Sequence, residues 1–165
     1  GRPVPEAFVE RFEDRLLAIY PEKLQVIDGV PALLDQLQDA GIGMAIATGG
    51  SLRRMGETLR VSGLDRWFQG RAFSADQVAQ GKPAPDLFLL AARELGVDPK
   101  DCVILEDSPH GVTGALRAGA RAVGFTGGSH LDLSRAEHAA LLRGKGAAQV
   151  LDSMTGMFAA LTTPA

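Results

Sequence analysis

The sequence predicts an α/β protein with a doubly wound parallel sheet, and three observations support this. Short apolar segments alternate with segments of helical periodicity along most of the 165 residues. The run 103–105 is apolar and branched throughout, as expected of a parallel strand buried on both faces. Most connections between the apolar segments are long enough to hold a right-handed crossover. The strands would then share one carboxyl edge, where open α/β sheets build their binding sites.

The predicted elements begin with two helices. Residues 5–20 carry apolar side chains at helical spacing with charges between them, so they predict an amphipathic helix that ends near Pro21. Pro31 fits the first turn of a second helix over 30–40, which Gly41 ends.

The rest of the chain alternates strands with helices. Apolar segments predict strands over 44–47, 72–74, 103–105, 122–125 and 148–151. Helical periodicity, with glycines or capping residues at the ends, predicts helices over 52–61, 85–95, 109–118, within 131–143 and over 153–161. This order predicts a parallel sheet with helices on both faces.

Composition narrows the class of protein. The chain is 45% hydrophobic and 22% charged, which suits one compact domain with a substantial core. Its net charge of −3 and its lack of basic runs argue against a nucleic-acid partner. It has no apolar stretch of the roughly eighteen residues that a membrane span needs. With no visible signal peptide and only Cys102, interpreted as a packing residue, we expect a cytoplasmic protein.

The first loop whose residues could form a functional site follows the strand over 44–47. Thr48 supplies a hydroxyl, Gly49 allows close approach to backbone N–H groups, and the next helix begins at once, which together make a small anion-binding loop. The alternative is a glycine-rich turn in which Ser51 only caps the helix.

The second loop is 81–86, with the sequence GKPAPD. Pro83 disfavours a helical conformation at Lys82, so the ammonium group would sit in an extended loop and neutralise a phosphate or a carboxylate. The alternative is an exposed lysine in a linker that prolines stiffen.

The third loop places Glu106 and Asp107 directly after the strand over 103–105. Adjacent carboxylates repel each other, so a fold that keeps them together usually supplies a cation, and oxygen ligands suit Mg²⁺. The alternative is an ordinary helix start that Asp107 or Ser108 caps. Together the three loops describe a site for a phosphoryl group bound with Mg²⁺.

The chain resembles the haloacid dehalogenase-like superfamily, in its branch of phosphatases and β-phosphoglucomutase with a helical cap. The resemblance rests on residues 45–49 (AIATG), 81–86 (GKPAPD), 105–112 (LEDSPHGV) and 115–119 (ALRAG). It implies a Rossmann-like core over 25–165 and a remnant of the helical cap over 1–24.

The same resemblance implies a role for each residue of the site. Thr48 and the Gly49 amide would hold the phosphate, and Lys82 would bridge the phosphate and the nucleophile in catalysis. Glu106 and Asp107 would bind Mg²⁺. The acidic pair favours the phosphatases, because the dehalogenases of this superfamily need no metal.

One motif of the family is missing from the sequence. The family carries its nucleophile in an Asp-x-Asp triplet on its first strand, and no such triplet occurs in these 165 residues. That strand would be central, between 44–47 and 103–105, so its absence would leave two unpaired apolar edges. Since the sequence opens with Gly1 rather than Met, we expect the nucleophile to lie in a longer parent protein and this chain alone to be inactive.

The predicted function is therefore that of a Mg²⁺-dependent phosphatase acting on a small phosphorylated metabolite through an aspartyl-phosphate, whose Asp is absent from this chain. A phosphomutase of the β-phosphoglucomutase type is one alternative. A non-catalytic relative that binds a phosphorylated ligand or a protein is another. The substrate and the oligomeric state stay open.

Overall fold

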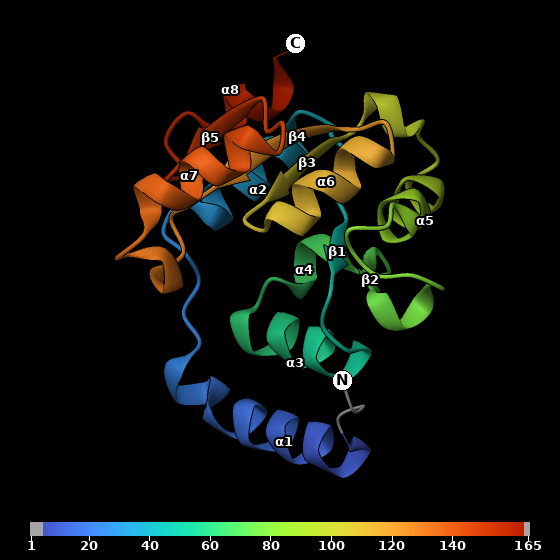
Figure 1. Cartoon of the computed structure of the whole chain (residues 1–165), viewed down its shortest axis with the longest axis vertical. Coiled ribbons are helices and arrows are strands. Elements are labelled where there is room, and N and C mark those ends of the chain that lie inside the picture. The colour runs from blue at the N-terminus through green and yellow to red at the C-terminus, as the bar shows by residue number, and fades with distance from the viewer. Residues whose placement is uncertain (1–4, 164–165) are drawn as a thin grey trace.

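The computed structural model describes residues 5–163, and residues 1–4 and 164–165 lie outside the described part (Figure 1). Its helices are α1 Glu6–Lys23, α2 Val30–Asp39, α3 Leu52–Ser62, α4 Asp65–Phe68, α5 Asp86–Leu95, α6 Pro109–Arg117, α7 Arg135–Gly144 and α8 Met157–Thr162. Its strands are β1 Ile46–Thr48, β2 Ala72–Ser74, β3 Val103–Glu106, β4 Arg121–Phe125 and β5 Gln149–Leu151.

All strand pairs are parallel, which confirms the predicted α/β class. β1 pairs with β2 so that Thr48 lies opposite Ser74. β3, β4 and β5 form a second sheet in that order, in which Glu106 lies opposite Gly124. The predicted site residues Thr48 and Glu106 therefore both lie at the carboxyl ends of their strands.

Helices cover both faces of the larger sheet. Successive side chains of β4 point to opposite faces, so this strand contacts both helix layers. Val123 and Phe125 pack with residues of α2 and α8. Ala122 packs on the other side with α6 and with Leu142 of α7. This arrangement is the predicted doubly wound one.

A gap separates the two sheets at the position where the sequence places the missing strand. Within residues 5–163, β1 and β3 each have one strand neighbour, and none lies between them. A cavity of about 560 Å³ occupies this gap, lined by apolar residues that include Ala47 and Leu105. Leu105 is 37% exposed, whereas Val123 in β4, with a strand on each side, is fully buried.

Three predicted boundaries were wrong. The first helix continues through Pro21 to Lys23, because a proline in the last turn removes only one hydrogen bond and leaves the earlier turns intact. β1 covers Ile46–Thr48 rather than 44–47, because its ladder with β2 starts where the Ile46 N–H meets the Arg71 carbonyl at 2.9 Å.

The last helix starts at Met157 instead of 153, because Gly156 has a φ of 76° and so stands outside the helix. The short helix α4 was not predicted as a helix. Its Trp67 and Phe68 are buried in a cluster with Leu34 of α2.

Helix α1 lies against α3, away from the larger sheet (Figure 1). Asp14 of α1 forms an ion pair with Arg53 of α3 at 2.7 Å. Phe8 and Phe12 of α1 are more than half exposed. The division into a cap remnant over 1–24 and a core over 25–165 stays a prediction. None of the helices in the described part is long and apolar enough to cross a membrane.

In the doubly wound arrangement, two adjacent leucines of α7 should contribute differently to the free energy of unfolding. Leu142 is fully buried against the sheet and Leu141 is 45% exposed. We expect Leu142→Ala to lower the free energy of unfolding by about 2–5 kcal/mol, since it leaves a cavity in the core. Leu141→Ala is the matched control and should cost less than about 1 kcal/mol. Urea denaturation measures both, and equal losses would contradict this packing of α7.

Candidate active site

The loop after β1 is held by local hydrogen bonds. The Gly50 N–H donates to the Thr48 hydroxyl oxygen at 3.1 Å, and the Ser74 hydroxyl donates to the Gly50 carbonyl at 2.6 Å. Ser51 caps α3 as predicted, accepting from the Arg54 N–H. A side chain at Gly49 would meet nothing within 4 Å, so this face of the loop is open to a ligand.

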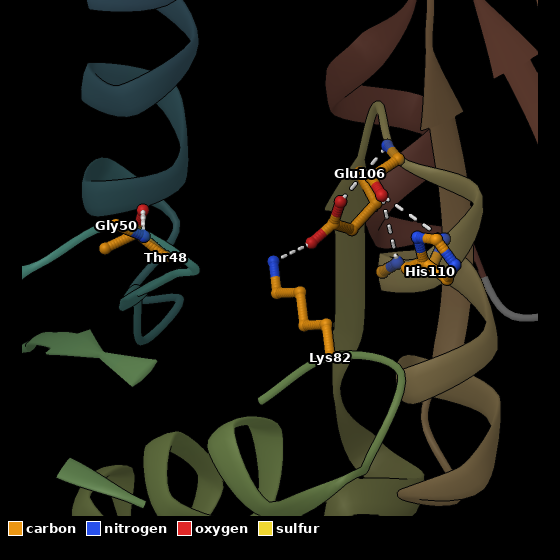
Figure 2. A network of polar contacts seen from close by, with 7 residues as sticks. Thr48, Gly50, Lys82, Glu106 and His110 are labelled. Carbon is orange, nitrogen blue, oxygen red and sulfur yellow. Dashed lines mark hydrogen bonds and ion pairs between the residues drawn. The ribbon is translucent and has the colours of Figure 1, made fainter. Parts of the chain in front are cut away.

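Lys82 is not the exposed linker residue of the alternative interpretation. Its side chain is 15% exposed, and its ammonium group forms an ion pair with the Glu106 carboxylate (Figure 2). The ammonium group also lies 4.9 Å from the centre of the Phe88 ring. The following loop is held by the Arg117 guanidinium, which donates to the Pro83 carbonyl at 3.1 Å.

Glu106 is the buried acid of the pair, at 7% exposure. Besides contacting Lys82, its carboxylate accepts a hydrogen bond from the Ser108 N–H at 3.3 Å. The carboxylate lies against the first turn of α6 at Gly111, where a Cβ atom would overlap it. Gly111 therefore provides the space that the buried carboxylate occupies.

Asp107 points into a different environment. Its side chain is 51% exposed, and the His130 Nε2 atom lies 3.5 Å from the Asp107 Oδ2 atom. The His138 Nε2 atom lies 2.6 Å from the Asp107 carbonyl oxygen. Neither contact is predicted from the sequence. The position of His130 in the loop after β4 was the one available signal, since that loop begins at the same sheet edge.

The structure joins some of the predicted site residues directly and leaves others apart. Lys82 and Glu106 are in contact, whereas the Thr48–Gly50 pair stands separately from them in Figure 2. Ala47 and Glu106 line the same 560 Å³ cavity, so the ends of β1 and β3 face one space. That the four side chains and the Gly49 amide act on one ligand stays a prediction.

Helix α1 reaches the loop after β1 through a contact that the sequence did not reveal. The Ser51 hydroxyl donates to the Glu13 carboxylate at 2.6 Å while it also caps α3. This contact places an acidic residue of α1 beside the candidate anion-binding loop.

The donor set at the end of β3 fits Mg²⁺. This ion takes oxygen ligands, often only one or two carboxylates, and keeps several waters. Asp107 presents a half-exposed carboxylate, and Glu106 supplies a second at the neighbouring position. Among the described residues no group of three or more His, Cys, Asp or Glu side chains stands ready to hold a metal, so other ligands would be water or substrate.

Cys102 lies at the opposite end of β3 and does not belong to the site. Burial raises the pKa of its thiol, with smaller contributions from Asp101 and Asp98. The thiol therefore stays protonated at neutral pH, which agrees with its interpretation as a packing residue.

The fold and the residues at the strand ends together define the class of this α/β protein. The family model for haloacid dehalogenase-like hydrolases matches residues 2–119. Hexitol phosphatase A of Escherichia coli is 37% identical over 111 residues, 67% of this chain and 50% of that protein. β-Phosphoglucomutase of Mycobacterium bovis is 38% identical over 135 residues, 79% of this chain and 48% of that protein.

A solved structure is similar over most of this chain. The HAD family hydrolase from Deinococcus radiodurans R1, determined with bound phosphate and sodium, has a TM-score of 0.77 and 33% identity. The match covers 97% of this chain and 71% of that chain. This chain belongs to the haloacid dehalogenase-like hydrolases, in their phosphatase and phosphoglucomutase branch. It spans about half the length of the two relatives above.

The contact between Gly111 and Glu106 makes a testable prediction. We expect Gly111→Ala to lower the free energy of unfolding by about 1–3 kcal/mol, because the added methyl group displaces a buried carboxylate. Gly56→Ala in α3 is the control, since nothing lies within 4 Å of its Cβ position. It should raise stability by about 0.5–1 kcal/mol through helix propensity. Chemical denaturation measures both, and similar stabilisation by the two variants would show that Glu106 does not occupy this space.

Proposed function

We propose that the intact protein is a Mg²⁺-dependent phosphatase that acts on a small phosphorylated metabolite through an aspartyl-phosphate. The observation that carries the proposal is the ion pair of Lys82 with Glu106, beside Asp107 and at the end of a parallel strand. A buried ammonium group and two neighbouring carboxylates match the needs of a phosphoryl group bound with a divalent cation.

Each residue would contribute by position and charge. The Thr48 hydroxyl and the Gly49 N–H would donate to phosphate oxygens from the open face of their loop. The Lys82 ammonium group would neutralise negative charge on the phosphoryl group as it transfers. Glu106 would hold that ammonium group in place through their ion pair.

Glu106 and Asp107 would also hold Mg²⁺, which when bound offsets the charge of the phosphoryl oxygens. The half-exposed carboxylate of Asp107 is accessible to a hydrated ion. The contact of His130 with that carboxylate would orient it.

The nucleophile would come from a strand placed in the gap between β1 and β3. Such a strand would complete one continuous sheet, and its carboxyl end would lie between Thr48 and Glu106. An Asp there would attack phosphorus and release the alcohol of the substrate, and water would then hydrolyse the acyl phosphate. The chain contains no Asp-x-Asp triplet, so we propose that this strand belongs to a longer parent protein and that these 165 residues alone do not turn over.

A phosphomutase is the second candidate, favoured by the 38% identity with a β-phosphoglucomutase. It would use the same loops and return the phosphoryl group to another hydroxyl of the sugar. Conversion between phosphate positions, measured against release of inorganic phosphate, separates the two activities. A non-catalytic phospho-ligand-binding relative is the third candidate, and it would have no Asp-x-Asp triplet upstream in the parent protein.

Turnover by the intact protein tests the role of Lys82. Lys82→Ala should reduce hydrolysis of an aryl phosphate by at least about a hundredfold, since it removes charge stabilisation of the transferring group. Lys100→Ala is the control, because Lys100 pairs with Asp98 on the exposed surface at 3.2 Å. Full activity of Lys82→Ala, with the fold intact by circular dichroism, would contradict the proposed site.

Metal binding by the 165-residue chain tests Asp107. Asp107→Asn should weaken Mg²⁺ binding by at least about tenfold in a calorimetric titration, because it removes an anionic ligand. Asp132→Asn changes an exposed acid that pairs with Arg135, and it should leave the affinity unchanged. Equal affinity of the Asp107 variant and the wild type would exclude this residue as a ligand.

A further inference from the structure

Arg54, in the first turn of α3, folds back over the loop that follows β1. A Cβ atom at Gly50 would overlap its guanidinium group, lying 2.5 Å from Nε and 2.8 Å from Cζ. Gly50 is also the residue whose N–H donates to the Thr48 hydroxyl. The guanidinium therefore lies on the candidate anion-binding loop itself rather than extending into solvent.

The charge of Arg54 is not neutralised by any side chain in the described part of the molecule. The side chains that hydrogen-bond to Arg54 there reach only its backbone: its N–H donates to the Ser51 hydroxyl oxygen, and its carbonyl accepts from the Thr58 hydroxyl. Two acids of α1 contact residues next to Arg54 in the chain or near it: Asp14 pairs with Arg53, and Glu13 accepts from the Ser51 hydroxyl.

Helix electrostatics oppose this placement. The amino end of a helix carries a partial positive charge, so a cation in the first turn is unfavourable. For Arg53 the neighbouring carboxylate offsets this cost, whereas Arg54 has no such partner among the described side chains. A bound anion at the loop would remove the imbalance.

We propose that Arg54 is a further phosphate-binding residue that works together with Thr48, Gly49 and Lys82. This inference rests on the proposed function and adds a group that the sequence motifs do not contain. The guanidinium fork would donate to phosphate oxygens from the α3 side of the loop. Lys82, which follows β2 in the chain, would supply the second positive charge, so a phosphate dianion would meet two cations.

The test is calorimetric titration of the 165-residue chain with inorganic phosphate in the presence of Mg²⁺. Arg54→Gln removes the charge and keeps most of the aliphatic stem, and it should weaken phosphate binding about tenfold. Arg54→Lys should lose less, because it keeps the charge but not the fork. Arg53→Gln is the matched control, one residue away and already paired, and should change the affinity less than about twofold.

The outcomes separate this inference from the proposed function. If Thr48→Val and Lys82→Ala weaken phosphate binding but Arg54→Gln binds like the wild type, the inference is wrong and the proposed site stands. If the wild type does not bind phosphate, the inference is wrong, whereas the proposed function is tested separately by turnover of the intact protein. Equal losses in the Arg53 and Arg54 variants would reveal a general charge effect and also overturn the inference. Thermal unfolding of each variant, with a midpoint like that of the wild type, confirms that the fold is retained.

Discussion

The ion pair between Lys82 and Glu106 connects two loops that are 24 residues apart in the chain. Both side chains are largely buried, and an isolated buried charge is costly, so each makes the position of the other possible. The pair fixes the loop after β2 to the carboxyl end of β3, across the gap between the two sheets. The contact depends in turn on Gly111, which leaves room for the carboxylate beside α6.

The gap between β1 and β3 divides the strands into two sheets. A parallel sheet normally buries its central strands on both faces and on both edges. Here β3 leaves Leu105 partly exposed toward a 560 Å³ cavity, while β4 next to it is buried. Helices α2, α5 and α8 line this gap. Its largely apolar lining agrees with the proposal that one more strand occupies it in the parent protein.

Residues of the site were predictable where local sequence carries the signal. A hydroxyl and glycines at 48–50, a lysine before Pro83 and two acids at the end of an apolar strand are all visible as short patterns. The caps Ser51 and Ser108 were likewise predictable, because capping is a local interaction between residues two or three apart. The contacts of His130 and His138 with Asp107 were missed, since they join residues more than twenty apart and no periodic pattern marks them.

The sequence by itself determined the α/β class, the order of strands and helices, and the residues at strand ends, because these depend on periodicity, caps and breakers along the chain. Only the tertiary structure decided which of those residues meet. It paired Lys82 with Glu106 rather than with Asp107, brought Glu13 of α1 to Ser51, and laid Arg54 over Gly50. These pairings depend on how far apart packed elements stand and which way their side chains point, and that geometry exists only once the core has formed.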